Sequence, residues 1–486
     1  TNTTQISMNR NEQVPVVADC DVVVIGGGPA GMAAASMAAR HGLSVTLIDE
    51  RPSAGGQIYR GLEDGPLKNN LGPDYVAGTN LIDRFRKADV DAHFGASLWR
   101  VDHGDKGGFA SFTSGGVSRR VAYKNLVLAT GAMERPVPFE GWTLPGVMGV
   151  GAAQLLLKSS GLAPAGPIVL AGNGPLLLLF ANQLLDLGVK ISAILDTAPR
   201  KNPAAVAARH LPALFANRAK LAKGLAMQRA IRAAGIEVHH DVSALRALGK
   251  ERVETVAFTA NGNSHDLPVD TLLTHEGVIP NTQLSRALNC AHVWDAGQNC
   301  LCPDVDRFGE TGLAGVFVVG DGAAINGAIA APASAEIAVG RILEWAGMLD
   351  DAGRAAVDAT NAVMKRERAF RPFLDALYPP RIAAAPLSDA TLVCRCEAVS
   401  AGAMRQAVRD GATGPAQAKV FTRAGMGPCQ GRVCGPIVTG LIAQERHSSP
   451  AEVGAYHVRF PLKPVTVGEM AKSRDKDNQD EAHHAA

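Results

Sequence analysis

The stretch that decides the fold is Asp21-Val-Val-Val-Ile25 followed by Gly26-Gly-Gly-Pro-Ala-Gly31. A short apolar run that ends in glycines predicts a buried parallel strand, and the alanine-rich segment 29–41 predicts a helix. A second apolar run, Val45–Ile48, predicts the next strand. The glycines have the spacing G-x-G-x-x-G in the strand–turn–helix context that nucleotide binding requires. The sequence therefore predicts a βαβ unit that binds a dinucleotide.

Each glycine of this turn has its own role. Gly26 allows the tight turn, Gly28 lets a pyrophosphate approach the backbone, and Gly31 lets the helix pack close to the strand. The phosphates then lie at the helix N-terminus, where free N–H groups and the helix dipole favour negative charge. Asp49 ends the second strand, in position to bind a ribose hydroxyl, and Glu50 takes that role if the strand ends one residue later.

A second glycine turn follows the apolar run Ile168–Ala171, so the chain carries two nucleotide-domain cores in tandem. A helix is predicted over 176–186 and a strand over 189–195. Leu177 replaces the third glycine here, which pushes the helix from the strand and distorts the phosphate site. A retained structural shell or a different nucleotide is favoured over NAD. The candidate ligands of this second site are Gly172, Gly174 and Asp196.

Two later segments resemble flavoproteins of the glutathione-reductase type, which contain two dinucleotide-binding domains. They are Leu126–Ala132 and Gly315–Gly322. In such proteins Asp321 hydrogen-bonds the ribityl chain of the flavin, and a helix N-cap before Ala323 is the structural alternative. The resemblance favours FAD at the first site. The residues it assigns to FAD are Gly26, Gly28, Pro29, Ala30, Gly31, Asp49, Glu50, Arg51, Gly56, Gln57, Ala129, Thr130, Gly131, Gly320 and Asp321.

Cysteine is absent from the segment Gly55–Tyr59, where disulfide-reducing members of this fold place a reactive pair, and from the whole stretch between Cys20 and Cys290. Dithiol chemistry is therefore not expected. Cys300 and Cys302 lack a further pair to complete a set of four and are expected in a loop rather than on a metal.

Four cysteines near the C-terminus form a compact set of metal ligands, Cys394-Arg-Cys396 and Cys429-Gln-Gly-Arg-Val-Cys434. Soft thiolates select zinc or iron–sulfur clusters. The C-x-C pair is tight for structural zinc, whereas four cysteines are the complement of a [2Fe–2S] cluster. Zinc and unmetallated thiols stay open as alternatives. The spacing resembles the bacterioferritin-associated-ferredoxin-like (BFD-like) domain, which commonly closes with C-x2-C instead of the four-residue gap found here.

The composition excludes several classes of protein. The chain has 486 residues, and 48 Lys+Arg against 46 Asp+Glu give a net charge of +2, too balanced for a nucleic-acid binder. No apolar run reaches the roughly 18 residues of a membrane-spanning helix. The first twenty residues are polar and lack a signal-peptide core. We expect a cytoplasmic protein without a transmembrane segment, with peripheral attachment to the inner face of the membrane as an option.

Residues 20–450 resemble the large subunit of the heteromeric amine dehydrogenases. That group includes opine (octopine/nopaline) oxidase, hydrogen cyanide synthase and D-hydroxyproline dehydrogenase. The segments that carry the resemblance are Asp49–Gln57, Ala129–Pro136, Gly141–Val147, His275–Asn281 and Arg423–Arg432.

The resemblance implies a small flavoprotein partner, similar to amino-acid oxidases, that oxidises an amine at its own FAD. This chain would then pass the electrons through its flavin and [2Fe–2S] cluster to a quinone or another acceptor. In some relatives an FMN lies between the subunits, a further small subunit is present, or the first nucleotide is not FAD. NAD is not expected.

The expected architecture is α/β: a glutathione-reductase-like flavoprotein with a small C-terminal BFD-like domain. The predicted parts are an N-terminal arm (1–19), a discontinuous FAD-binding domain (20–135 plus 270–375), a second nucleotide domain (136–269), a linker (376–389), the BFD-like domain (390–450) and a C-terminal tail (451–486).

Two other functions stay open at this stage. One is a stand-alone NAD(P)H-dependent flavin and iron–sulfur reductase, and the other is a catalytically silent scaffold that binds a nucleotide for stability. We assign no catalytic residue. His275 and Glu276 are the nearest acid–base candidates and Tyr59 is a candidate flavin neighbour, each against a structural alternative. A basic segment, 201–235, is either a solvated helix face or a docking face for an acidic partner or a phosphate.

Overall fold

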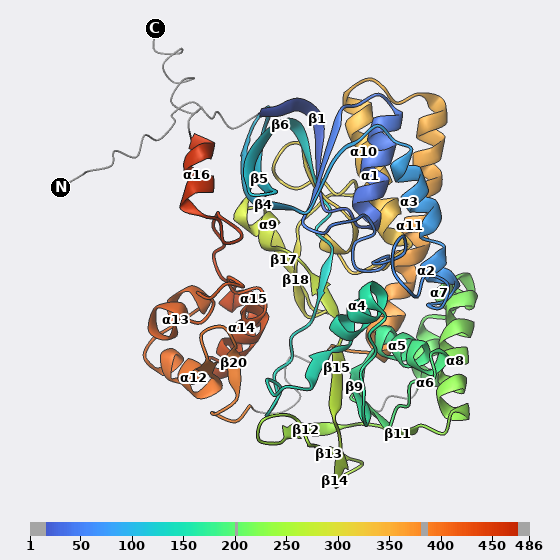
Figure 1. Cartoon of the computed structure of the whole chain (residues 1–486), viewed down its shortest axis with the longest axis vertical. Coiled ribbons are helices and arrows are strands. Elements are labelled where there is room, and N and C mark those ends of the chain that lie inside the picture. Colours follow the sequence, from blue (N-terminus) through green and yellow to red (C-terminus); the bar gives the residue numbers. More distant parts are fainter. Residues whose placement is uncertain (1–15, 200–202, 381–386, 475–486) are drawn as a thin grey trace, which may run out of the picture.

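The computed structural model describes residues 16–199, 203–380 and 387–474 (Figure 1). The first domain is built on a seven-stranded sheet, in which five strands run parallel and an antiparallel pair extends one edge. The parallel strands are β1 (Val16–Ile25), β2 (Val45–Asp49), β3 (Asp91–Phe94), β6 (Val117–Leu128) and β19 (Val316–Val318). The antiparallel pair is β4 (Ala96–Gly104) and β5 (Gly107–Ser114).

The predicted βαβ unit is confirmed by β1, α1 (Pro29–Arg40) and β2. Val22, Val23 and Val24 are fully buried because β1 lies in the middle of the sheet and is covered on both faces. α1 lies beside α10 (Ala330–Trp345; Figure 1), and the small alanine side chains of α1 allow the two helices to pack closely. β1 begins inside the predicted arm, because Val16 and Val17 pair with β6. Residues 1–15 lie outside the described part of the chain.

The second domain holds a fully parallel sheet in the order β11-β10-β9-β15-β8. Its strands are β8 (Val147–Gly149), β9 (Ile168–Asn173), β10 (Ala193–Asp196), β11 (Glu237–His239) and β15 (Thr271–Glu276). Two helices, α4 (Val150–Ser160) and α5 (Pro175–Asp186), pack on the sheet. A three-stranded meander accompanies it: β12 (Ser243–Leu248), β13 (Thr255–Ala260) and β14 (Asn263–Pro268).

Two sequence-based boundaries shift in this domain. The predicted return to the first domain at residue 270 is too early, because β15 pairs with β9 and β8 and so belongs to the second sheet. The chain crosses between the domains on two antiparallel strands, β7 (Ala132–Glu134) and β16 (Val278–Pro280). The strand predicted from residue 189 starts only at Ala193, since the N–H of Val189 instead donates to Leu184 at the end of α5.

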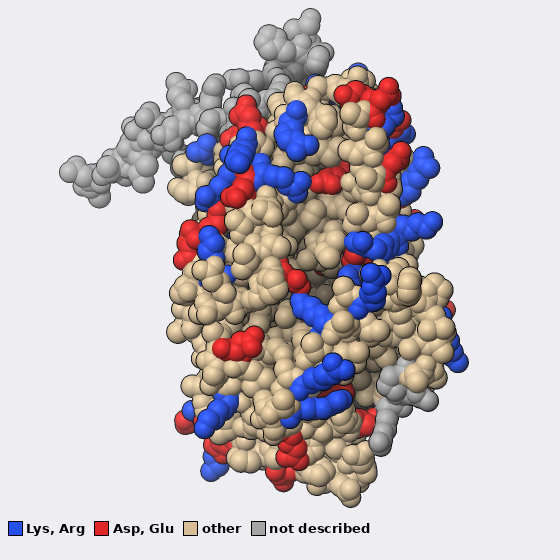
Figure 2. Space-filling view, turned by 90° about the vertical axis from the view of Figure 1, so that its right-hand side faces the viewer, with Lys and Arg blue, Asp and Glu red and all other residues tan. Residues whose placement is uncertain are grey.

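The basic segment is helical, as α6 (Pro203–Arg209), α7 (Leu211–Ala216) and α8 (Arg218–Ala233). Lys220 pairs with the buried Glu367 of α11 (Asp351–Leu377), and Lys223 pairs with Asp74 of α2 (Pro73–Val76). On this side of the molecule Lys and Arg are spread among Asp and Glu (Figure 2). Most of the other basic residues of these helices are exposed, so the structure favours a solvated helix face over a docking site. Lys201 lies outside the described residues.

α11 ends two residues inside the predicted linker, and residues 381–386 lie outside the described part. The next part of the chain forms a small module with a core of its own, including the fully buried Val393, Met404, Val438 and Ile442. Its elements are β20 (Leu392–Cys394), β21 (Val399–Ser400), α12 (Ala401–Arg409), α13 (Pro415–Thr422), α14 (Cys434–Glu445) and α15 (Pro450–Val453). We call it the cysteine module. The indole N–H of Trp142, in the second domain, donates to its Leu392 carbonyl at 2.7 Å.

After the cysteine module the chain returns to the first domain as a segment that we call the C-terminal strap (residues 454–474; Figure 1). The N–H of Leu462 donates to the carbonyl of Trp99 on β4 at 2.9 Å. Helix α16 (Val467–Arg474) lies along β6, where the hydroxyl of Ser118 donates to the carbonyl of Glu469 at 2.9 Å. The part predicted as a tail therefore begins as a connection between two domains. No helix of the described residues is long and apolar enough to cross a membrane.

Candidate functional site

The N-terminus of α1 leaves its free N–H groups open for an anion. Its N-cap residue, Gly28, has an extended backbone (φ −77°, ψ −174°) and no side chain that could accept from the first turn. A Cβ on Gly56 would lie 2.7 Å from the Cα of Gly28, so a second glycine loop crosses directly over the turn. Side chains at these positions would fill the space above the free N–H groups. The backbone therefore fits a pyrophosphate at this end of α1.

The end of β6 closes another side of the same turn. A Cβ on Gly26 would lie 2.4 Å from the carbonyl oxygen of Ala129. The N–H of Ala129 donates to the carbonyl of Ile25 at 2.9 Å. The hydroxyl of Thr130 donates to the carbonyl of Asn281 at 2.9 Å, and the carbonyl of Gly131 accepts from the N–H of Asn281 at the same distance. Residues 129–131 are thus held between the glycine turn and the chain that returns from the second domain.

Asp321 lies next to this cradle, in the short 3-10 helix η1 (Gly320–Gly322). Its Oδ1 accepts from the N–H groups of Asn326 and Gly327, both at 2.9 Å. Burial raises the pKa of this carboxyl, while the two N–H groups lower it. The alternative of an N-cap before Ala323 is not formed, because the carboxylate holds the following loop instead. Ala30 and Gly320 are neighbours, since a Cβ on Gly320 would lie 2.8 Å from that of Ala30.

Of the two acids at the end of β2, Asp49 lies against the glycine turn. Its Oδ2 accepts from the N–H of Gly27, and its Oδ1 accepts from the N–H of Arg51 at 2.7 Å. Glu50 points away and pairs with Lys463 of the C-terminal strap. The side-chain amide of Gln57 donates to Ala132 at 3.1 Å, linking the second glycine loop to β7. The Tyr59 ring packs against residue 78, which has to be glycine.

Sequence patterns did not reveal Lys158, which is buried on α4 with 4% of its surface exposed. Its Nζ donates to the carbonyls of Ile58 at 2.9 Å and Gln57 at 3.3 Å, and to Oε1 of Gln154 at 3.1 Å. Burial, aided by the charge of Arg60, lowers the pKa of Lys158 to about 7. The lysine fixes the chain that follows the second glycine loop. No motif marks it, because its partners are backbone groups about 100 residues away.

A pH dependence of stability follows from Lys158. Its folded pKa of about 7 lies below the ~10.4 of an unfolded lysine, so the unfolded chain binds more protons between these values. The free energy of unfolding should therefore rise with pH across this window, by up to about 1.4 kcal/mol per pH unit. Lys158→Met should remove that part of the slope in denaturant unfolding between pH 7 and 9. Lys124→Met, at an exposed lysine, is the control. Equal slopes in wild type and Lys158→Met would contradict the assignment.

The second glycine turn differs from the first in its backbone. A Cβ on Gly31 would lie 1.7 Å from the carbonyl oxygen of Gly26, so the geometry of the first turn admits no side chain there. In the second turn the N-cap Gly174 has φ 103° and ψ 166°, unlike Gly28, and Leu177 is buried in the core with 3% exposure. The turn is rebuilt around the leucine.

Side chains of the second domain also occupy the groups that a nucleotide would need. Glu276 accepts from Nδ2 of Asn173 at 2.9 Å and from the hydroxyl of Thr197 at 2.7 Å, which places a carboxylate at the ends of β9 and β10. Asp196, the candidate ribose ligand, contacts Nδ1 of His240 at 3.0 Å. A buried carboxylate beside the turn disfavours a phosphate. That the second site does not bind NAD stays a prediction.

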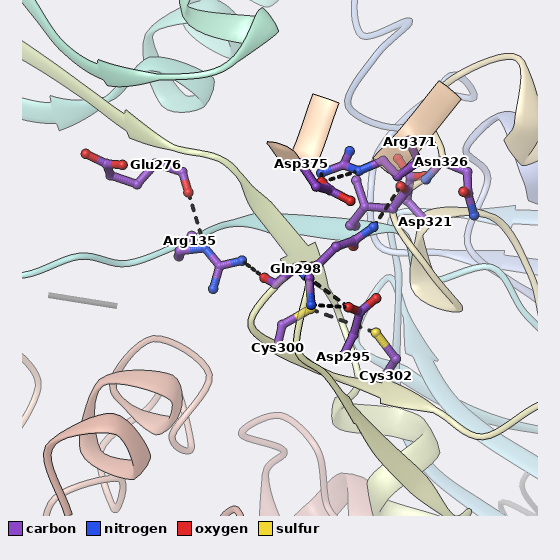
Figure 3. A network of polar contacts seen from close by, with 12 residues as sticks. Arg135, Glu276, Asp295, Gln298, Cys300, Cys302, Asp321, Asn326, Arg371 and Asp375 are labelled. Carbon is purple, nitrogen blue, oxygen red and sulfur yellow. Dashed lines mark hydrogen bonds and ion pairs between the residues drawn. The ribbon is translucent and has the colours of Figure 1, made fainter. Parts of the chain in front are cut away.

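Arg135 joins the two crossing strands to a hairpin of the first domain, β17 (His292–Asp295) and β18 (Cys300–Pro303), as Figure 3 shows. Its guanidinium, 8% exposed, donates to the carbonyls of Glu276 at 3.2 Å, Gln298 at 2.5 Å and Asn299 at 2.8 Å. Nearby, Nδ1 of His275 contacts Glu134 at 2.7 Å, and Glu134 accepts from the first turn of α4. His275 and Glu276 thus serve contacts within the protein, which favours their structural alternative.

Cys300 and Cys302 lie on β18 and not in the expected loop, because their segment pairs with β17 in regular register. Their sulfur atoms are 3.8 Å apart and buried (Figure 3). The Cys302 thiol and the Arg135 guanidinium lower the pKa of Cys300, against the effect of burial.

The four cysteines of the cysteine module lie together. Cys394 ends β20 and Cys434 begins α14, both almost fully buried, whereas Cys429 is half-buried and Cys396 is exposed. Their thiols are neighbours in the order Cys396, Cys429, Cys434, Cys394. A Cβ on Gly427 would lie 2.3 Å from that of Cys396, so the loop of the second pair reaches the first pair only through a glycine.

Cys429 is prepared to bind a metal as a thiolate. The Cys434 thiol, and after it backbone N–H groups of the same loop, lower the pKa of Cys429 to about 4, although burial opposes them. In the described part of the chain no three His, Cys, Asp or Glu side chains surround one point closely enough to hold a single ion. A [2Fe–2S] cluster divides its four thiolates between two irons, so four thiols that neighbour one another in pairs suit it.

The fold and the two sites define a class: flavoproteins with two dinucleotide-binding domains and an added iron–sulfur domain. Residues 20–341 match the family described as "Pyridine nucleotide-disulphide oxidoreductase", and residues 392–444 match the "BFD-like [2Fe-2S] binding domain". Both the fold class and the two domain types predicted from the sequence are confirmed.

The chain is 41% identical to the A subunit of opine oxidase from Agrobacterium tumefaciens (strain Ach5), over 93% of this chain and 91% of that one. It is 32% identical to the HcnB subunit of hydrogen cyanide synthase from Pseudomonas aeruginosa, over 91% and 96%. The structure of L-proline dehydrogenase from P. horikoshii superposes with a TM-score of 0.69 at 21% identity, over 94% of this chain and 80% of that one. The chain therefore belongs to the oxidoreductase family that contains these opine oxidase and hydrogen cyanide synthase subunits.

Proposed function

We propose that this chain is the electron-transferring subunit of a heteromeric amine dehydrogenase that acts on an opine, an imino acid or an amino acid. The observation that carries the proposal is the contrast between the two glycine turns. The first is open at the N-terminus of α1, whereas the second is rebuilt around Leu177 and faces the carboxylate of Glu276. A chain with a flavin site, four cluster thiols and a closed nicotinamide site needs another source of electrons. A partner subunit that oxidises the amine supplies them.

The residues of this chain then hold and orient cofactors. The N-terminus of α1 would hold the FAD pyrophosphate, Asp49 the ribose and Asp321 the ribityl chain. The [2Fe–2S] cluster would be held by Cys394, Cys396, Cys429 and Cys434. A flavin supplies the exchange between a two-electron donor and one-electron carriers. The names of the relatives as subunits support a partner. The partner we propose is a small flavoprotein similar to amino-acid oxidases, and the acceptor we propose is a quinone or another carrier.

An anaerobic visible titration of the purified chain with NADH tests this proposal. We expect flavin and [2Fe–2S] absorption that stoichiometric NADH leaves unchanged, because the second turn cannot hold the nucleotide. Bleaching at stoichiometric NADH would instead establish a stand-alone reductase. A protein without any chromophore would favour the silent scaffold.

A second arm of the same titration replaces NADH with octopine and other N-substituted amino acids. The chain alone should stay oxidised, and the complex isolated through a tag on this chain should be bleached. Reduction of the chain alone by an amine would place substrate oxidation on this chain itself. That result would refute the proposal that a partner subunit oxidises the amine.

A further inference from the structure

Tyr456 of the C-terminal strap packs on the loop that carries the second cysteine pair. Its side chain is 6% exposed. A Cβ on Gly425 or Gly431 would lie 2.8 Å from its ring, and one on Gly435 would lie 3.5 Å from it. The ring therefore occupies space that exists only because the loop has glycines there. Tyr456 lies beyond residue 444, where the match to the BFD-like domain ends, so the strap adds a wall to the cluster site.

The hydroxyl of Tyr456 points toward the thiols. It is buried and forms no hydrogen bond of regular distance and angle among the described residues, although the Cys434 thiol lies close enough to interact with it. Burial raises the pKa of Tyr456, and the neighbouring thiols of Cys434, Cys394 and Cys429 raise it further. Leaving a buried hydroxyl unpaired destabilises the folded protein. An acceptor supplied at the thiols would remove this cost.

Contacts from three directions fix the tyrosine. Arg286, on helix α9 (Gln283–Ala287) of the first domain, donates to the carbonyl of Tyr456. The Nζ of Lys419 lies 5.7 Å from the ring centroid. The hydroxyl of Thr439 on α14 donates to the carbonyl of Gly454 at 2.8 Å. A donor held this firmly needs little reorganisation when it forms a hydrogen bond.

We propose that the Tyr456 hydroxyl donates a hydrogen bond to a cysteine sulfur of the bound [2Fe–2S] cluster and thereby raises its reduction potential. Such a bond is stronger to the reduced cluster, which carries one more negative charge, so it favours reduction. The four-residue gap of the second pair fits this role. Gly431 has φ 77° and Gln430 has φ 49°, so the longer loop turns back and presents a glycine to the ring. The proposal rests on the cluster assignment within the proposed function and not on the partner subunit.

The test is an EPR-monitored redox titration of the full chain carrying Tyr456→Phe, with chemical mediators and no partner. We expect a lower cluster potential than in wild type. Pulsed EPR of the reduced cluster in H2O and D2O should also show one fewer strongly coupled exchangeable proton. Tyr123→Phe is the matched control, because Tyr123 is equally buried but its hydroxyl contacts His103 in the first domain. Its cluster potential should equal that of wild type.

An unchanged potential in Tyr456→Phe at full cluster content would overturn the proposal and leave Tyr456 as packing only. If that variant fails to assemble a cluster, 3-fluorotyrosine at position 456 decides. Fluorination leaves the ring in place and makes the hydroxyl more acidic, so its hydrogen bond should strengthen and the cluster potential should rise. An unchanged cluster potential would overturn the proposal. Absence of a [2Fe–2S] signal from wild type would refute the cluster assignment itself. The NADH and amine titrations bear on the electron source alone, so the two failures are distinguishable.

Discussion

Cys434→Ser is expected to abolish the [2Fe–2S] absorption and EPR signal and to reduce the iron content of the purified chain to near zero. Cys434 is 1% exposed and its thiol touches both Cys429 and Cys394, so no solvent-exposed group can take its place. A serine hydroxyl is a hard, weakly acidic ligand that does not replace a thiolate on iron. Because cluster binding contributes to folding, the cysteine module should also unfold at a lower temperature.

Flavin absorption should survive in Cys434→Ser, because the glycine cradle belongs to another domain. Cys20→Ser is the matched control: Cys20 is buried at 7% exposure on β1, and its replacement should leave the iron content unchanged. A Cys434→Ser variant with full iron content and a wild-type EPR signal would show that another residue completes the ligand set.

Gly31→Ala should produce a chain that purifies without flavin. The new Cβ would lie 1.7 Å from the carbonyl oxygen and 2.9 Å from the carbonyl carbon of Gly26. Both are backbone atoms, so the clash is relieved only if α1 moves away from β1. That movement opens the phosphate site and exposes the apolar side chains packed between α1 and the sheet. The flavin-to-protein ratio from visible absorption measures the effect, and the iron content should stay near that of wild type.

Gly224→Ala is the matched control: it makes the same chemical change at a position where we expect the opposite outcome. Gly224 is in the interior of α8, and apart from its chain neighbours and the backbone of its own helix no atom lies within 4 Å of the position that its Cβ would take. The substitution should therefore leave flavin binding normal and stabilise the chain by about 0.5–1 kcal/mol. Flavin retained at full occupancy in Gly31→Ala would mean that the first turn tolerates a side chain and that its fit to a pyrophosphate was misjudged.

Local patterns carried most of what could be predicted. The strand–turn–helix unit around Gly26 and the cysteine spacing are encoded within short stretches, and both domain types are confirmed. The sequence also predicted that the second turn is altered at Leu177, because the loss of a glycine at this position has a defined steric effect. The return from the second domain was placed too early, since an apolar strand such as β15 does not reveal which of two parallel sheets it joins.

What the sequence did not reveal depends on contacts between distant segments. Nothing in the local sequence distinguishes Lys158 from a surface lysine, and only the fold brings it to the carbonyls of residues 57 and 58. Tyr456 follows a recognisable domain and carries no motif of its own. The loop contacts of Asp321 take the place of the N-cap alternative, because the N–H of Ala323 already donates to the carbonyl of Gly320. The FAD-contact roles of the cradle residues stay predictions.

The attachment of the cysteine module at two points has a consequence for how charge moves through the molecule. Many electron carriers hang on a single flexible tether and search between donor and acceptor. Here the Trp142–Leu392 hydrogen bond holds one end of the module, and the C-terminal strap fastens the other to β4 and β6. In our proposal the module is an electron relay, and a relay anchored in this way would work at a constant tunnelling distance. Its speed should be insensitive to solvent viscosity, and any physiological acceptor has to come to it.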